Sequence, residues 1–159
     1  MTTHRSSGWF DSKWLPQTIQ PERDICGRTS QEIEALVALT KTECPCTPKY
    51  YASKHTNQSS DGWVPGGFLD YIVMEKLEGV TLSDEYLSDL PRREQQELRN
   101  AFKSSDVECQ ERGFYHLDAS LSNLIWNKLK MKCYIVDWEA RVRKAYPWDD
   151  DEYLRWGLL

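Results

Sequence analysis

The sequence contains no apolar run approaching the roughly 18 residues that a membrane-spanning helix requires. Its first seven residues are polar and lack the apolar centre of a secretory signal peptide. Basic residues are in the minority, with 20 Lys and Arg against 25 Asp and Glu, so the net charge is -5. That balance disfavours general binding to nucleic acid or to anionic membranes. We therefore expect a cytoplasmic or nuclear protein that binds neither nucleic acid nor anionic membranes.

Cysteine is present, but not in the number or spacing of a disulfide framework. The five residues are an odd number at irregular intervals: Cys26, Cys44, Cys46, Cys109 and Cys133. This usage agrees with a reducing compartment. The pair in Cys44-Pro45-Cys46 has no second pair at the spacing of zinc ligands, so we interpret these cysteines as loop thiols and not as a metal site.

Length and composition favour one compact domain. A chain of 159 residues is long enough to bury a substantial hydrophobic core, and we treat residues 1–159 as a single domain. The seven Trp and eight Tyr have no Lys- or Arg-rich surroundings. They are therefore expected to serve core packing and not the stacking of nucleic-acid bases.

Two segments have the pattern of a helix. A capping box, Thr29 to Glu32, predicts the start of the first helix, with a buried stripe formed by Ile33, Leu36 and Val37. The second helix is predicted over residues 91–112, because Pro91 suits a first helical turn and apolar residues recur at helical spacing. Gly113 supplies its stop signal.

The other elements are short strands and connections. Strands are expected at residues 8–16, 68–75, 114–115, 124–126 and 133–136. Proline and glycine mark residues 41–67 as a connection with a short strand around Tyr50 and Tyr51, and residues 17–28 as a loop. The acidic run at 149–152 could bind a divalent cation, but a solvated helix start is the preferred interpretation. Together these elements predict an α+β fold.

The most informative pattern joins residues 113–126 to residues 134–139. His116-Leu-Asp118 follows the glycine that ends the second helix, and Asn123 lies five residues after Asp118. A strand, a turn and another strand then lead to Asp137. This order resembles the protein-kinase-like superfamily, which includes the aminoglycoside and choline kinases.

The resemblance implies a role for each of these residues. Asp118 would face the acceptor hydroxyl, Asn123 and Asp137 would hold Mg²⁺ against the phosphates of ATP, and His116 would be a scaffold residue of the catalytic loop. Phosphoryl transfer depends mainly on positioning and charge neutralisation, which is why it needs these groups at this spacing. The alternative, that Asp118 and Asn123 are ordinary turn residues, stays open.

Further features that fit the resemblance lie upstream. Residues 72–82 resemble the last N-lobe strand and the hinge, whose backbone contacts adenine in the family, so Glu75 and Leu77 are expected to border the nucleotide. Glu32 resembles the glutamate of helix C and Lys13 the lysine that contacts the phosphates. Glu32 could instead only close the capping box, and Lys13 could be a surface lysine. The implied division is an N-lobe remnant over about residues 1–75 and a truncated helical C-lobe over 76–159.

Several features of the family are missing. The eight glycines never form G-x-G-x-x-G, the loop that covers the phosphates. Leu117 and Ser120 stand where many protein kinases carry an arginine and a lysine, and Trp138-Glu139 replaces the Phe-Gly after the metal-binding aspartate. The 22 residues after Asp137 are too few for an activation segment and the helices that bind protein substrates.

Three functions of different classes remain. The first is an atypical Mg²⁺-ATP-dependent phosphotransferase that acts on a small-molecule hydroxyl. The second is a pseudokinase-like binding or scaffolding module, in which a protein partner or a second copy covers the truncated lobes. The third is a kinase-like pocket used for acid–base chemistry on a small metabolite. The joint presence of Asp118, Asn123 and Asp137 favours the first.

Overall fold

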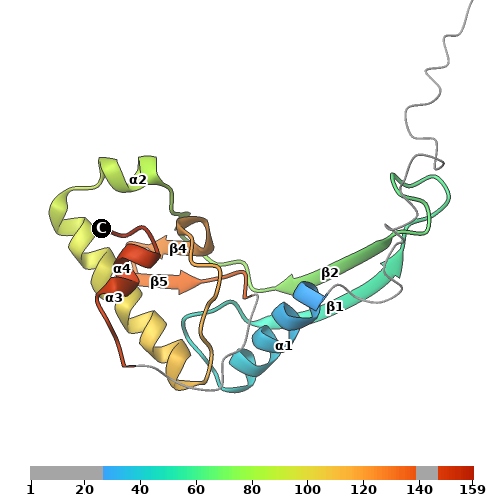
Figure 1. The fold of residues 1–159 in the computed structure, drawn as a ribbon, viewed down its shortest axis with the longest axis horizontal. Helices are drawn as coiled ribbons and strands as arrows, with labels where there is room; N and C mark the ends of the chain where they lie inside the picture. Colours follow the sequence, from blue (N-terminus) through green and yellow to red (C-terminus); the bar gives the residue numbers. More distant parts are fainter. Residues whose placement is uncertain (1–26, 139–146) are drawn as a thin grey trace, which may run out of the picture.

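The computed structural model describes residues 27–138 and 147–159, and within them the chain has an α+β fold (Figure 1). Two small antiparallel sheets lie in different parts of the molecule. One is a hairpin beside the first helix, and the other has three strands and packs on the longest helix. The predicted strand at 8–16, and with it Lys13, lies outside the described residues.

Helix α1 (Gly27–Lys41) begins earlier than the capping box predicts. Thr29 lies inside the helix, so its predicted role as the residue that caps the start is wrong. The buried stripe consists of Ala35, Leu36 and Leu39, which confirms only Leu36 of the predicted set, since Ile33 and Val37 are half-buried. Residues spaced three and four positions apart lie on one face of a helix. Tertiary contacts bury the face formed by Ala35, Leu36 and Leu39, which is next to the predicted face.

The hairpin pairs β1 (Tyr50–Asn57) with β2 (Phe68–Met74) in antiparallel register. The prediction at 68–75 is confirmed as a strand, but its expected burial is wrong, because β2 alternates between half-buried and exposed residues. The predicted strand at Tyr50 and Tyr51 was too short, since β1 has eight residues. Figure 1 shows the hairpin extending away from the rest of the molecule, which leaves much of its surface in solvent.

The segment after β2 joins the two sheets. The main-chain N–H of Glu75 donates to the Lys49 carbonyl at 2.8 Å, and the Asn127 side chain donates to the Glu78 carbonyl at 3.0 Å. Gly79 has φ 143°, and a Cβ atom there would lie 2.6 Å from the carbonyl oxygen of Trp126. Only glycine fits this close approach of the segment to the second sheet.

The second sheet has the order β3-β4-β5: β3 is Val80–Thr81, β4 is Leu124–Asn127 and β5 is Lys132–Ile135. Helix α3 (Arg92–Glu111) packs against β5, and the two are tied by a 2.6 Å hydrogen bond from the Ser105 hydroxyl to the Cys133 carbonyl. The core between them includes Leu98, Phe102, Leu124, Trp126 and Ile135. The predicted strands at 124–126 and 133–136 are confirmed to within a residue.

Helix α3 confirms the prediction at 91–112, with Pro91 at its N-cap. It ends in a Schellman motif, in which Gly113 (φ 80°) and Phe114 donate to the carbonyls of Gln110 and Cys109. The predicted strand at 114–115 is therefore wrong. The Phe114 N–H closes the helix and is not available to a strand partner.

Two short helices complete the described chain. Helix α2 (Asp84–Asp89), capped by the Ser83 hydroxyl, was not predicted. Helix α4 (Asp151–Arg155) follows the acidic run and confirms its interpretation as a helix start. None of the described helices is long and apolar enough to cross a membrane.

Candidate functional site

The loop that follows α3 is organised around the buried His116 ring. Its Nε2 donates to the carbonyl oxygen of Val136 at 3.0 Å, just after β5. The ring lies between Trp138 and Trp156, with centroid separations of 5.0 Å to each. His116 therefore connects the loop to the end of β5, and its expected role as the scaffold residue of a catalytic loop stays a prediction.

Asn123 connects the same two segments from the other side. It ends a short 3₁₀ turn, η2 (Leu121–Asn123), and is buried. Its side-chain N–H donates to the Asp118 carbonyl at 3.0 Å, while its own carbonyl accepts from the N–H of Val136 at 3.0 Å. A single residue thus bonds to the main chain of Asp118 and to the residue before Asp137. The structure brings the three predicted residues into one neighbourhood.

Asp137 occupies an unusual backbone conformation. Its φ is 61°, in the left-handed region that few residues other than glycine adopt. The strand before it is paired and Trp138 after it is buried, with its Nε1 donating to the Ile135 carbonyl at 3.2 Å. The side chain of Asp137 remains exposed between these two anchors. Backbone strain held in this way is characteristic of functional sites.

The carboxylates of Asp118 and Asp137 both act on His116. Burial lowers the pKa of the His116 ring from its ordinary value of 6.5, because the charged form loses its hydration. The bond to Val136 and the negative charges of Asp137 and Asp118 oppose that shift. The ring is therefore neutral near pH 7, and a neutral ring suits a scaffold better than a proton donor.

The oxygen atoms at this site are of the kind that a hard divalent cation prefers. Asp118 and Asp137 offer exposed carboxylates, and the Asn123 side-chain oxygen makes no hydrogen bond within the described part of the chain. Mg²⁺ is usually held by one or two carboxylates, with water and phosphate as its other ligands. This donor set fits it. Residues 27–138 and 147–159 hold no group of three or more His, Cys, Asp or Glu side chains that would form a complete metal cage.

Two residues of α4 hold the loop in place and were not predicted. Arg155 donates from Nη1 to the His116 carbonyl at 2.8 Å and from Nε to Glu152 at 2.7 Å. Glu152 also accepts from the Tyr115 hydroxyl at 3.0 Å, and the Arg155 guanidinium lies 4.5 Å from the centre of the Tyr115 ring. No local pattern reveals the contacts of α4 with Tyr115 and His116, because they join residues 37 to 40 positions apart in the sequence.

The upstream candidates are only partly placed. Glu32 lies in α1 and Lys13 lies outside the described residues, so the roles that the resemblance implies for these two residues stay predictions. Glu75 binds Lys49 through both its main-chain N–H and its carboxylate, at 2.8 and 3.2 Å. Leu77 is half-buried in the segment that joins the sheets. Its expected contact with a nucleotide stays a prediction.

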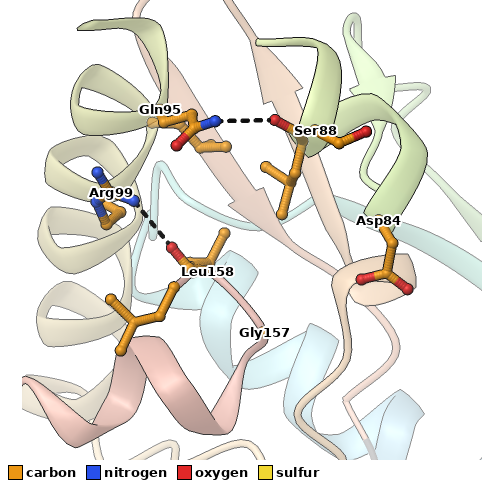
Figure 2. Close-up of a pocket in the computed structure, with 9 residues that line it drawn as sticks. Asp84, Ser88, Gln95, Arg99, Gly157 and Leu158 are labelled. Carbon is orange, nitrogen blue, oxygen red and sulfur yellow. Dashed lines mark hydrogen bonds between the residues drawn. The ribbon is translucent and has the colours of Figure 1, made fainter. Parts of the chain in front are cut away.

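A separate pocket of about 220 Å³ lies between α2, α3 and the C-terminal residues (Figure 2). Arg99 donates to the Leu158 carbonyl at 3.1 Å across it, and Gln95 donates to the Leu87 carbonyl at 3.1 Å at its rim. None of the predicted site residues lines this pocket. This pocket therefore does not belong to the candidate site.

A comparison of the chain with protein-family models found no match, and a comparison with curated proteins found none either.

Proposed function

We propose that the chain is a reduced protein-kinase-like domain that acts as an atypical Mg²⁺-ATP-dependent phosphotransferase on a small-molecule hydroxyl. The observation that carries the proposal is the position of Asn123. Its hydrogen bonds to the main chain of Asp118 and of Val136 bring the segments that carry Asp118 and Asp137 together, and this supports a site with one carboxylate for the acceptor and one for the metal, as phosphoryl transfer requires.

Each residue has a distinct task in this proposal. The Asp118 carboxylate orients the acceptor hydroxyl and accepts its proton, while Asn123 and Asp137 would hold Mg²⁺ through their side-chain oxygens. The cation, when bound, neutralises phosphate charge. His116 stays neutral and keeps the loop at a fixed distance from the end of β5.

The segment between the two sheets also supports the proposal of a nucleotide site. Residues 75–79 run from β2 to β3, and within the described part of the chain the main chain of Leu77 makes no hydrogen bond. Those groups are free to pair with the edge of a purine base. The contacts of Glu75 with Lys49 keep the start of this segment in place.

Isothermal titration calorimetry with Mg²⁺-ATP tests the assigned roles. Asp137→Asn removes the charge that holds the cation, so we expect nucleotide affinity to fall by at least about tenfold, or about 1.4 kcal/mol. Asp118→Asn spares that affinity and removes turnover, measured as ADP release with a panel of small alcohols and amino sugars. Asp89→Asn, at the exposed end of α2, is the matched control and leaves both unchanged.

Two results would contradict the proposal. The first is the absence of binding heat and of any change in melting temperature when wild type meets millimolar Mg²⁺-ATP. The second is equal binding by wild type and by both variants, which would show that the carboxylates do not have these roles.

A pseudokinase-like binding module is the second candidate. The observation that favours it is the exposed apolar surface of the hairpin, where Tyr51, Tyr71 and Val73 are each at least half exposed. Surfaces of this kind commonly mark contacts between proteins. This candidate predicts association with a protein partner or a second copy and no ADP release.

A further inference from the structure

Three elements that are distant in sequence meet around a group of buried thiols. Cys44 lies in the turn after α1, and Cys109 lies in the last turn of α3. Their sulfur atoms are 3.8 Å apart. Cys46 is close to Cys44, and its main-chain carbonyl accepts from the N–H of Ile135 in β5 at 2.9 Å.

We propose that Cys44 and Cys109 are an oxidation site, at which a peroxide converts the two thiols into a reversible disulfide that joins the turn after α1 to α3. A disulfide requires a sulfur–sulfur distance of about 2.05 Å. Closing the gap from 3.8 Å takes a change in side-chain rotamer and a small shift of the turn. This proposal does not depend on the phosphotransferase.

Both thiols are buried, and Cys44 is the more accessible of the two, with an exposed fraction of 6% against 0% for Cys109. Cys44 lines a surface depression of about 490 Å³, together with Thr40, Glu43, Pro45, Pro48 and Lys49. Cys109 is fully buried behind it. A small peroxide therefore reaches Cys44 first, and Cys109 can react only with the oxidised form of Cys44.

The electrostatic surroundings assign the same order. Hydrogen bonds from Cys109 and Cys46, with a contribution from the Arg112 charge, lower the pKa of Cys44. The hydrogen bond with Cys44 and burial raise the pKa of Cys109. A thiolate is the reactive form of cysteine, so Cys44 is the attacking thiol and Cys109 the resolving one.

The reaction balances in two steps. The Cys44 thiolate attacks one peroxide oxygen, the O–O bond breaks, and the leaving hydroxide takes up a proton to become water, which leaves a sulfenic acid on Cys44. Cys109 then attacks the Cys44 sulfur, the S–O bond breaks, and a second water leaves with the Cys109 proton. In sum, two thiols are oxidised to one disulfide and hydrogen peroxide is reduced to two waters.

The test treats the folded wild-type chain with a small excess of hydrogen peroxide, removes the peroxide, unfolds the chain in urea with iodoacetamide to block the remaining thiols, and maps the tryptic peptides by mass spectrometry. We expect a monomer lighter by two hydrogens before alkylation, in which residues 42–49 are linked to residues 104–112. The melting temperature should rise, because the link restricts the unfolded chain, and dithiothreitol should reverse both changes.

Serine variants assign the pair. Cys44→Ser and Cys109→Ser should abolish the link, while Cys46→Ser and Cys133→Ser should retain it. A link between Cys44 and Cys46, a link found only between two chains, or alkylation of both thiols in the peroxide-treated protein would overturn the proposal. Fragmentation of the linked wild-type peptide between Cys44 and Pro45 shows whether Cys44 or Cys46 carries the link, so the mapping decides the matter even where a variant fails to fold.

Discussion

At the scale of single residues, a few positions meet demands that their neighbours in sequence do not reveal. Gly79 passes so close to β4 that no side chain fits, and Asp137 is held with a positive φ by the paired strand before it and the buried Trp138 after it. Asp106 is a carboxyl group that is almost completely buried within α3. A substitution at these positions should change the free energy of unfolding.

Gly79→Ala should destabilise the protein by at least about 2 kcal/mol, because the added Cβ would meet the Trp126 carbonyl at 2.6 Å and φ is 143°. Urea unfolding monitored by tryptophan fluorescence measures the change. Gly27→Ala is the matched control: its Cβ would meet no atom within 4 Å, so stability should stay equal or increase by up to about 1 kcal/mol. Equal losses in the two variants would contradict the steric explanation.

Asp106→Asn should change how stability depends on pH. Burial raises the pKa of Asp106 from 3.8 to about 6, against a bond from Gln110 that lowers it. Between those values the folded protein keeps a proton that the unfolded chain has released, so this group's contribution to stability falls as pH rises and is lost above about pH 6. Near pH 7, where Asp106 is ionised, its burial lowers the free energy of unfolding by an amount on the order of 3 kcal/mol.

The asparagine variant lacks that titration, so its stability relative to wild type should increase by about 3 kcal/mol from about pH 4 to about pH 7. Urea unfolding of both proteins across that range measures the difference. His116 has the opposite effect, since its pKa is lowered by burial, but it titrates in both proteins and cancels. A difference that stays constant with pH would show that Asp106 does not titrate in this window.

At the scale of elements, the shortest helix has the largest effect on the candidate site. Helix α4 has five residues, too few to be stable alone, and it is held by tertiary contacts. Trp156 packs on His116, and Arg155 bonds to the His116 carbonyl. The position of the loop that carries Asp118 thus depends on a segment almost 40 residues downstream.

Arg155→Lys should loosen that attachment, because a lysine cannot bond to His116 and Glu152 at once with the geometry of a guanidinium. We expect a loss of about 2 kcal/mol in urea unfolding and faster amide hydrogen exchange at residues 114–118. Arg93→Lys, at an exposed i,i+4 pair with Glu97, is the control and should cost less than about 0.5 kcal/mol. Unchanged exchange in the loop would show that α4 does not hold it.

At the scale of the whole molecule, the uneven burial is the main feature. Helix α3 and the β3-β4-β5 sheet enclose most of the core, while the β1-β2 hairpin extends away and, within the described residues, pairs with no further strand (Figure 1). Tyr71 and Val73 lie two residues apart on one face of β2, with exposed fractions of 50% and 52%. Exposed strand edges and apolar faces favour association.

We therefore expect the protein to self-associate as its concentration rises. The double variant Tyr71→Lys/Val73→Lys should be more monomeric than wild type, because two charges on one face of β2 disfavour contact between two hairpins. Light scattering coupled to size-exclusion chromatography measures the molar mass at several concentrations. Leu129→Lys, at an almost fully exposed apolar residue in the β4-β5 turn, should have no effect. A wild-type protein that is monomeric at every concentration would rule out this role for the hairpin.

Much of the fold was predictable because its signals are local. The spacing of apolar residues predicted α3, proline and glycine marked its ends, and β-branched and aromatic residues predicted β2 and β5. The grouping of Asp118, Asn123 and Asp137 also followed from a short pattern, since only 18 residues lie between the first and the last. The predicted strand at 114–115 and the start of α1 at Thr29 were wrong, because a helix cap and tertiary packing outweighed local preference.

The sequence by itself determined the α+β class, the bounds of α3 and the presence of three polar residues at a strand–turn–strand, because each depends on interactions between near neighbours. Only the tertiary structure decided which face of α1 is buried, that Arg155 supports the loop and that Cys44 meets Cys109. The physical reason is the same in each case. These contacts join residues far apart in the chain, and burial and hydrogen bonding select them only when the whole molecule has packed.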